Sequence, residues 1–197
     1  MKKWKWAMIF FCISIIALWV WRYTSLNSKY AEMFHLDKVV FELGEKVPFG
    51  TDYLEMDMQA DGYWLRVNDF EVMPYDEYME DSGVALAQIH MIPDRIALIH
   101  VTLFNEDSSA EGVMLTQLIL HGYDSYASMN WDVLTAVNPI LEGNHGIRLL
   151  QGSECELILP FNLVERYHKS CVWENLDNYT FFLRITSFPT KKDISLQ

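Results

Sequence analysis

The beginning of the chain differs from the remainder in its pattern of hydrophobic and polar positions. No charged residue interrupts the sixteen residues from Trp6 to Trp21, while lysines precede the run and Arg22 follows it. As a helix, this run is about 24 Å long at about 1.5 Å per residue, and flanking cations that reach the head groups complete a ~30 Å hydrocarbon core. The pattern predicts a membrane-spanning helix over residues 6–21.

A cleaved signal peptide is the competing interpretation of this segment. Such a peptide has a shorter apolar region, followed by small residues at the −3 and −1 positions. Every candidate pair after the apolar run, from Tyr23/Ser25 to Lys29/Ala31, has at least one bulky or polar member. The absence of a suitable cleavage site favours an uncleaved membrane anchor, which comprises residues 1–24. The excess of lysine before the run predicts that the N-terminus is cytoplasmic and that the remainder of the chain is extracellular.

Beyond Asp37 the hydrophobic pattern becomes that of a β domain. Short stretches of period two or of continuous apolar character alternate with turn residues, which is typical of antiparallel strands. The strongest strand signal covers residues 95–105. Further strands are expected at residues 54–58, 63–73, 84–91, 113–121, 146–151, 154–161 and 180–188, with the pair 146–151 and 154–161 forming a hairpin. Pro74 to Gly83 predicts one or two helical turns.

Seven or eight strands over about 150 residues predict an all-β fold with two packed sheets. We therefore expect a β-sandwich at residues 47–190, with a stalk or linker at 25–46 and a tail at 191–197. The stalk is expected to continue the anchor helix, because apolar residues recur in it at helical spacing.

Charge excludes one class of function. The chain has 27 acidic and 15 basic residues, and four of the basic residues lie in the N-terminal segment, so the rest carries 11 minus 27, or −16. A body this acidic repels phosphate backbones, and we expect no nucleic-acid partner.

The motifs of common enzymes are absent from the sequence. No two of the six histidines are three, four or five residues apart, which excludes a helical zinc-protease signature. The chain also lacks a Gly-x-Ser-x-Gly elbow, a P-loop and a Gly-x-Gly-x-x-Gly turn. We therefore predict no catalytic, cofactor-binding or metal-binding residue and no enzymatic activity.

Acidic residues are concentrated between Asp52 and Glu111, where fourteen acids accompany two bases. Calcium takes six to eight oxygen ligands, but the spacing matches no EF-hand loop. The pattern favours a solvated acidic face, and a calcium-stabilised ectodomain remains an alternative.

Two cysteines, Cys155 and Cys171, lie in the part expected outside the cell. An oxidising exterior permits a disulfide between them. The sequence is compatible both with a disulfide between Cys155 and Cys171 and with two separate thiols.

The longest connection between expected strands, residues 122–145, carries several aromatic residues. Tyr123, Tyr126 and Trp131 are candidates for a partner-binding surface, since aromatic side chains bury large areas at little entropic cost. The alternative is that Tyr123 and Trp131 close one end of the sandwich as part of its core.

Several segments, taken in order, resemble the membrane-tethered, immunoglobulin-like domains of unknown function found on Gram-positive bacteria. They are the lysine-led anchor, GEKVPFG at 44–50, DGYWLRVNDFEVMPYDEY at 61–78, IHVTLFNEDS at 99–108, LLQGSE at 149–154 and the SFPTKK tail. The resemblance implies an extracellular, immunoglobulin-like antiparallel β-sandwich without a known reaction. The pair Cys155 and Cys171 departs from that family.

These expectations combine into one functional hypothesis. The chain is a single-pass membrane protein, anchored through residues 6–21, that serves as a non-enzymatic binding or accessory module for a cell-surface protein or ligand. The alternatives are the calcium-stabilised structural ectodomain and a hydrolase with an unrecognised site.

Overall fold

The computed structural model describes residues 2–34, 36–54, 60–84, 91–107, 112–123 and 125–197. The chain divides into two compact units, Met1–Leu36 and Asp37–Gln197. The strands expected at 54–58 and 84–91 lie almost wholly outside the described residues.

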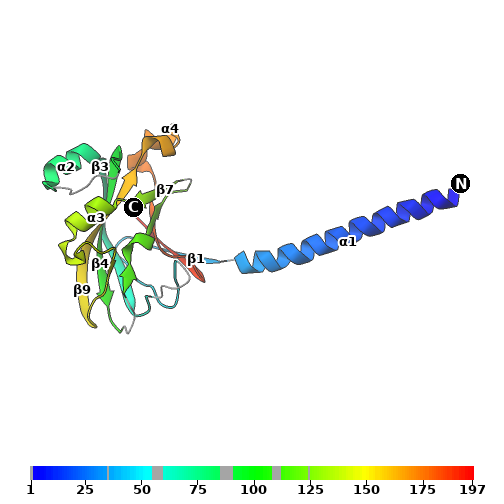
Figure 1. The fold of residues 1–197 in the computed structure, drawn as a ribbon, viewed down its shortest axis with the longest axis horizontal. Helices are drawn as coiled ribbons and strands as arrows, with labels where there is room; N and C mark the ends of the chain where they lie inside the picture. The colour runs from blue at the N-terminus through cyan, green and yellow to red at the C-terminus, as the bar shows by residue number, and fades with distance from the viewer. Residues whose placement is uncertain (1, 35, 55–59, 85–90, 108–111, 124) are drawn as a thin grey trace. The chain divides into compact units, whose positions relative to one another are not determined.

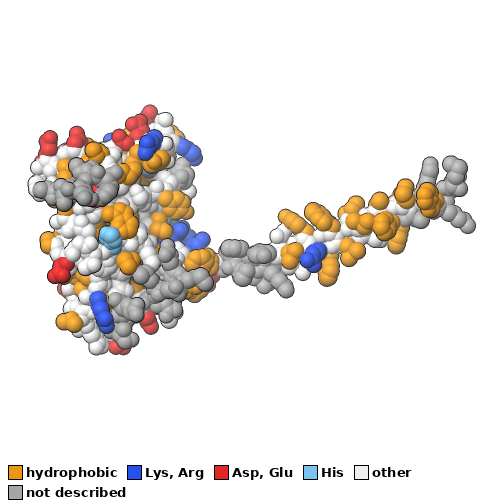
Figure 2. All heavy atoms as spheres, in the orientation of Figure 1, with side chains coloured by type: hydrophobic (Ala, Val, Ile, Leu, Met, Phe, Trp, Pro, Cys, Tyr) orange, Lys and Arg blue, Asp and Glu red, His pale blue; other side chains and the backbone are white. Residues whose placement is uncertain are grey.

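The first unit is a single helix, α1 (Lys2–Phe34), and Figure 1 shows it in blue. Its segment Met8–Asn27 is long and apolar enough to cross a membrane. Figure 2 shows hydrophobic side chains along its visible length. The expected helix at 6–21 is therefore present, and it continues without a break through the first part of the expected stalk.

The second unit is built on a sheet of nine strands among the described residues. The strands are β1 (Asp37–Phe41), β2 (Lys46–Pro48), β3 (Tyr63–Pro74), β4 (Arg95–Asn105), β6 (Ile119–His121), β7 (Tyr126–Met129), β9 (Ser153–Leu163), β10 (Phe182–Thr186) and β11 (Thr190–Ser195). They pair in the order β1-β11-β10-β6-β7-β9-β4-β3-β2. A separate pair joins β5 (Val113–Met114) to β8 (Gly146–Ile147).

Short helices complete the unit (Figure 1). They are α2 (Tyr75–Ser82), α3 (Trp131–Val137) and α4 (Ser170–Trp173), with 3₁₀ turns at Leu115–Gln117, Pro139–Leu141, Glu165–Tyr167 and Leu176–Asn178. The turn expected from Pro74 to Gly83 is confirmed as α2, which ends where Gly83 takes a left-handed φ of 63°.

The sheet folds into two layers around a shared core. Strand β7 pairs with β6 on one side and with β9 on the other, so it joins the two halves. Leu65 and Leu157 from the β2-β3-β4-β9 half belong to the same buried cluster as Leu120 and Leu183 from the other half. This arrangement is a β-sandwich-like, mostly β fold, as the strand pattern predicts.

A second, smaller core covers the outer face of β4. Ile96 and Leu98 pack there against Tyr75 and Tyr78 of α2 and Val133 of α3. Because β4 is therefore buried on both faces at this end, its apolar run is continuous, which explains why it gives the strongest strand signal.

The domain boundaries differ from those expected. Strand β1 lies in the expected stalk and β11 lies mostly in the expected tail, and the two pair in parallel from Asp37↔Thr190 to Phe41↔Ile194. Neither segment has a strong local pattern, because the pairing joins residues about 150 positions apart.

The pairing of β3 with β4 has a register shift between Val67 and Asp69. Two local expectations are corrected by the structure. The expected strand 113–121 is divided into β5 and β6 by a 3₁₀ turn. The expected hairpin of 146–151 with 154–161 is wrong, because β8 pairs with β5 and β9 pairs with β4 and β7.

Candidate functional site

Helix α3 is fixed to the side of β9 by an asparagine at each end. Asn130 caps the helix, its Oδ1 accepting a hydrogen bond from Val133 N at 3.0 Å, and its backbone N donates to Pro160 O at 2.8 Å. At the other end, Asn138 Nδ2 donates to Ile158 O at 2.8 Å, and Ile158 N donates to Asn138 Oδ1 at 2.9 Å. The helix therefore occupies the edge of β9 that the short strand β7 leaves open.

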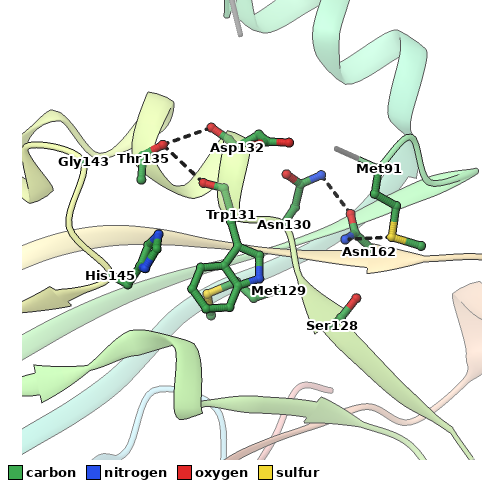
Figure 3. A pocket seen from close by; sticks show the side chains of 10 residues that line it. All are labelled: Met91, Ser128, Met129, Asn130, Trp131, Asp132, Thr135, Gly143, His145 and Asn162. Carbon is green, nitrogen blue, oxygen red and sulfur yellow. Dashed lines mark hydrogen bonds between the residues drawn. The ribbon is translucent and has the colours of Figure 1, made fainter. Parts of the chain in front are cut away.

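An open groove of about 460 Å³ lies at the beginning of α3 (Figure 3). The described residues that line it are Met91, Ser128, Met129, Asn130, Trp131, Asp132, Thr135, Gly143, His145 and Asn162. They come from β7, α3, β9 and the segments that precede β4 and β8. Its volume lies within the range of small-ligand sites.

Two buried side-chain amides form one wall of the groove. Asn130 Nδ2 donates to Asn162 Oδ1 at 2.8 Å, and the two residues are 3% and 6% exposed. Among the described residues, the Nδ2 group of Asn162 contacts Met91 Sδ at 3.7 Å. A thioether is a weak acceptor, so this buried amide retains donor capacity toward the groove.

An aromatic side chain forms the opposite wall. Trp131 is 44% exposed, and its ring meets the His145 ring edge to face at 4.3 Å with an angle of 84°. Figure 3 shows the indole ring between His145 on one side and the Asn130–Asn162 pair on the other. The core interpretation of Trp131 is therefore wrong, and the residue contributes an open aromatic surface.

The charge of the groove is low. Its described lining includes one acid, Asp132, and neither lysine nor arginine. Thr135 Oγ1 donates to backbone carbonyls of Trp131 and Asp132, so this hydroxyl serves the helix. The groove can bind a neutral or weakly cationic group by apolar contact and hydrogen bonds, and its described lining offers no lysine or arginine to an anion.

The other two aromatic candidates lie apart from Trp131. Tyr123 and Tyr126 are 81% and 69% exposed and contact Phe182 and His121, which are neighbours across β10 and β6. Together, Tyr123, Tyr126, His121 and Phe182 form an aromatic patch. Tyr126 and Ser128 are two residues apart on β7 and point to the same face, and Ser128 lines the groove, so the patch lies next to the groove. The structure therefore separates the three candidates into a patch and a groove.

Behind the patch lies a buried ionic network. Asp193 accepts hydrogen bonds from Arg184 Nε at 2.8 Å and Nη2 at 3.0 Å, while His121 Nε2 and Lys38 Nζ lie 3.3 and 3.2 Å from its Oδ2. Burial by itself raises the pKa of the Asp193 carboxyl, but hydrogen bonds with His121 and Arg184 outweigh burial and hold that pKa well below its usual value. The ionised carboxylate therefore connects β1, β6, β10 and β11.

A second cavity, of about 430 Å³, lies on the outer face of β3, β4 and β9. His100 and Asp69 are among its lining residues, and His100 Nε2 lies 3.7 Å from Glu71 Oε1. Among the described residues, no three His, Cys, Asp or Glu side chains gather closely enough to hold a metal ion. The part of the chain that the structure describes therefore provides no such cluster for the calcium alternative.

The acidic residues of β3 and α2 are solvated. Six acids of the segment 52–111 lie here and are exposed, in agreement with the predicted solvated face: Asp69, Glu71, Asp76, Glu77, Glu80 and Asp81. Asp52, at the start of the same segment, differs, because it is 9% exposed and its Oδ2 lies 2.7 Å from Lys192 Nζ.

The disulfide that the sequence left open is not formed. Cys155 lies near the start of β9, whereas Cys171 lies on α4, where the Trp173 ring centre is 5.6 Å from the guanidinium of Arg95. Arg95 pairs with Leu163 at the far end of β9. From Cys155 to Leu163 the strand extends about 26 Å at about 3.3 Å per residue, whereas a bridge needs Cα atoms about 5.5 Å apart. Both thiols are free.

Sequence reasoning missed the three asparagines that organise this site. Asn130 precedes an apolar helical stretch, which is the signature of an N-cap and could have identified it. Asn138 has no such signal, because its partner Ile158 lies 20 residues away in the sequence. Asn162 has none either, because its contacts with Asn130 and Ser128 depend on the pairing of β7 with β9.

Comparison with known proteins places the domain without assigning an activity. A family model described as a domain of unknown function (DUF5028) matches residues 38–192. Curated proteins give no match. Among solved structures, an uncharacterised β-sandwich protein from Clostridium difficile 630 is 10% identical, with a TM-score of 0.39, and the match covers 82% of this chain and 97% of that one.

Proposed function

Because this chain belongs to the DUF5028 family, a domain of unknown function, we propose a function from its own groove and anchor. The chain is a membrane-anchored, extracellular β-sandwich of Gram-positive bacteria that acts as a non-enzymatic binding or accessory module at the cell surface. The groove beside Trp131 is its binding site.

The order of the strands supports an immunoglobulin-like version of the sandwich. Immunoglobulin domains place strands A, B, E and D in one sheet and C, F and G in the other. We assign the letters A to G in chain order to β3, β4, β6, β7, β9, β10 and β11. The observed order β3-β4-β9-β7 then corresponds to A-B-E-D, and the order β6-β10-β11 corresponds to C-F-G.

The properties of α1 support the anchor. Its segment Met8–Asn27 has the length and composition of a membrane span, and cations concentrate before the apolar run. In a single-pass protein this bias orients the short N-terminal side toward the cytoplasm.

The half-exposed ring of Trp131 is the observation that carries the binding role. Tryptophan is enriched at the centres of interfaces, where it fills well-packed sites. Here the ring is held by His145 and by its place at the start of α3, and it borders a groove instead of filling the core.

Two experiments on cells that produce the full chain test the proposal. First, protease added to intact, wall-stripped cells digests the acidic domain, and intact mass finds the N-terminal segment retained. Protection of the domain, or a mature chain that begins after Arg22, would contradict the anchored, outward-facing topology.

Second, a photoreactive phenylalanine is placed at position 131 in the full chain on living cells. The matched control carries it at Leu150, which is more exposed and lies outside the groove. We expect a specific adduct from position 131 and none from position 150. Equal adducts from both positions, or none from either, would contradict a binding role for the groove.

A further inference from the structure

We propose that the groove at the start of α3 binds a short neutral saccharide. This inference rests on the binding function proposed above and specifies the class of ligand. It is argued from the charge, the aromatic wall and the buried amides of the groove.

The described lining of the groove disfavours anionic ligands. Phosphate and carboxylate groups are bound by arginine, lysine or helix N-termini, and the described lining of the groove has neither basic residue. Helix α3 has seven residues, and its Asn130 cap already uses one of the first backbone N–H groups.

The aromatic wall favours a ligand with a flat apolar face. The ring of Trp131 is 44% exposed, and its edge-to-face contact with His145 holds it in place. A pyranose ring presents a face of C–H groups that fits against such a ring by dispersion and burial of apolar area. A ring that is already fixed loses little conformational entropy on binding.

The amide wall favours a ligand rich in hydroxyl groups. Asn130 is committed through its Oδ1 to Val133 N and through its Nδ2 to Asn162 Oδ1. Asn162 Nδ2 therefore faces the groove with the weak acceptor Met91 Sδ as its contact. Ser128 pairs with Asn162 across β7 and β9, so its hydroxyl projects from the same face of the sheet.

These polar groups lie on one side of the indole ring (Figure 3). A sugar that stacks on Trp131 turns its ring hydroxyls toward Asn162 and Ser128, where each hydroxyl both donates and accepts. An acyl chain in the same place would leave the Asn162 amide without a partner, and burying such a group unpaired is costly. The chemistry of both walls is therefore met by a neutral saccharide.

The test uses the full chain in micelles of a zwitterionic detergent, because a detergent with a sugar head group would compete. The probes are the neutral trisaccharides N,N′,N″-triacetylchitotriose, cellotriose and maltotriose, and their binding is measured by saturation-transfer NMR and titration calorimetry. At least one trisaccharide is expected to bind, and Trp131→Ala is expected to weaken it by roughly tenfold.

Two further variants separate stacking from loss of fold. Trp131→Phe retains an aromatic face and is expected to recover part of the affinity, and Ser128→Ala is expected to weaken binding without changing the melting temperature. Leu150→Ala, outside the groove, is expected to bind as the parent does.

Three results would contradict the proposal that the groove binds a saccharide. They are the failure of all three probes at about 10 mM, binding that Trp131→Ala leaves unchanged, and displacement of the sugar by inorganic phosphate. If position 131 still crosslinks to a protein on cells while no sugar binds, the ligand class is wrong and the binding function stands. If both readouts fail, both proposals fall.

Discussion

The side chain of Asn138 and the backbone of Ile158 pair as if they were neighbouring strand residues. Asn138 Nδ2 donates to Ile158 O at 2.8 Å, and Ile158 N donates back to Asn138 Oδ1 at 2.9 Å. The same Nδ2 also donates to Leu134 O within α3 at 2.8 Å. The Asn138 side-chain amide thus hydrogen-bonds to the last turn of the helix and to the backbone of β9 at a position that β7 does not reach.

This relationship predicts that Asn138→Ala destabilises the domain. Removal of the amide leaves the N–H and carbonyl of Ile158 without their partner, which costs about 1–3 kcal/mol of unfolding free energy. Denaturant unfolding measures the change. Asn144→Ala, at an exposed position on the following loop, is the control and is expected to stay within about 0.5 kcal/mol of the parent. Equal effects of the two variants would contradict the structural role of Asn138.

The ionic network predicts a strong effect of Asp193→Asn. Asp193 is fully buried and is held by Arg184 and His121. Removing its charge leaves the partly buried Arg184 cation without its counter-ion, and breaking a buried pair costs about 3–5 kcal/mol. Unfolding measurements near neutral pH test this. Asp81→Asn, on the exposed part of α2, is the matched control.

The same carboxylate predicts a dependence of stability on pH. Folding lowers the pKa of Asp193, so the unfolded state takes up a proton more readily than the folded state. The stabilisation of the fold by the Asp193 carboxylate is complete above about pH 3.9, the pKa of an aspartate in the unfolded state. This stabilisation is lost as the pH falls below that value toward the pKa of Asp193 in the folded state. The stability difference between the parent and Asp193→Asn is therefore expected to narrow below about pH 3.9. A difference that stays constant there would count against the lowered pKa.

Gly122 is predicted to tolerate no side chain. A Cβ atom at this position would overlap the outer part of the Tyr179 ring. Gly122→Ala must displace that ring, which stacks edge to face on Phe181 at 5.0 Å, and overpacking of this kind costs about 1–3 kcal/mol. In a double-mutant cycle, Gly122→Ala is expected to cost less in a Tyr179→Ala background. An unchanged cost would show that the clash is not with Tyr179.

Trp131→Ala is predicted to change stability little. The ring is half exposed and borders a groove, so its loss is expected to cost about 1 kcal/mol, whereas Phe161→Ala in the core is expected to cost about 3–5 kcal/mol. Thermal melting of the two variants compares them directly. A loss at Trp131 as large as that at Phe161 would return the residue to the core and remove it from the binding site.

The separated cysteines predict two reactive thiols. In a Cys12→Ser background, alkylation without reductant is expected to add two labels by intact mass, whereas a bridge would leave none. Cys171 is exposed, while burial, with a smaller contribution from Glu156, raises the pKa of the Cys155 thiol. Cys171 is therefore expected to react first, because the thiolate is the reactive form.

Much of the fold could be predicted because its signals are local. The apolar run of α1, the continuous run of β4 and the Pro74 to Gly83 turn each depend on residues within a few positions of one another. The wrong hairpin shows the limit of this approach, since Gly146–Ile147 is too short to specify a partner and pairs with β5.

The sequence by itself determined an apolar N-terminal helix, an acidic body and a set of strands that must pack in two layers, because periodicity and charge are properties of neighbouring residues. Only the tertiary structure decided that β1 joins β11, that Cys155 and Cys171 lie at opposite ends of a strand, and that Trp131 borders a groove. Those features depend on which distant strands pair. Pairing is set by the closure of the whole core and not by any single segment.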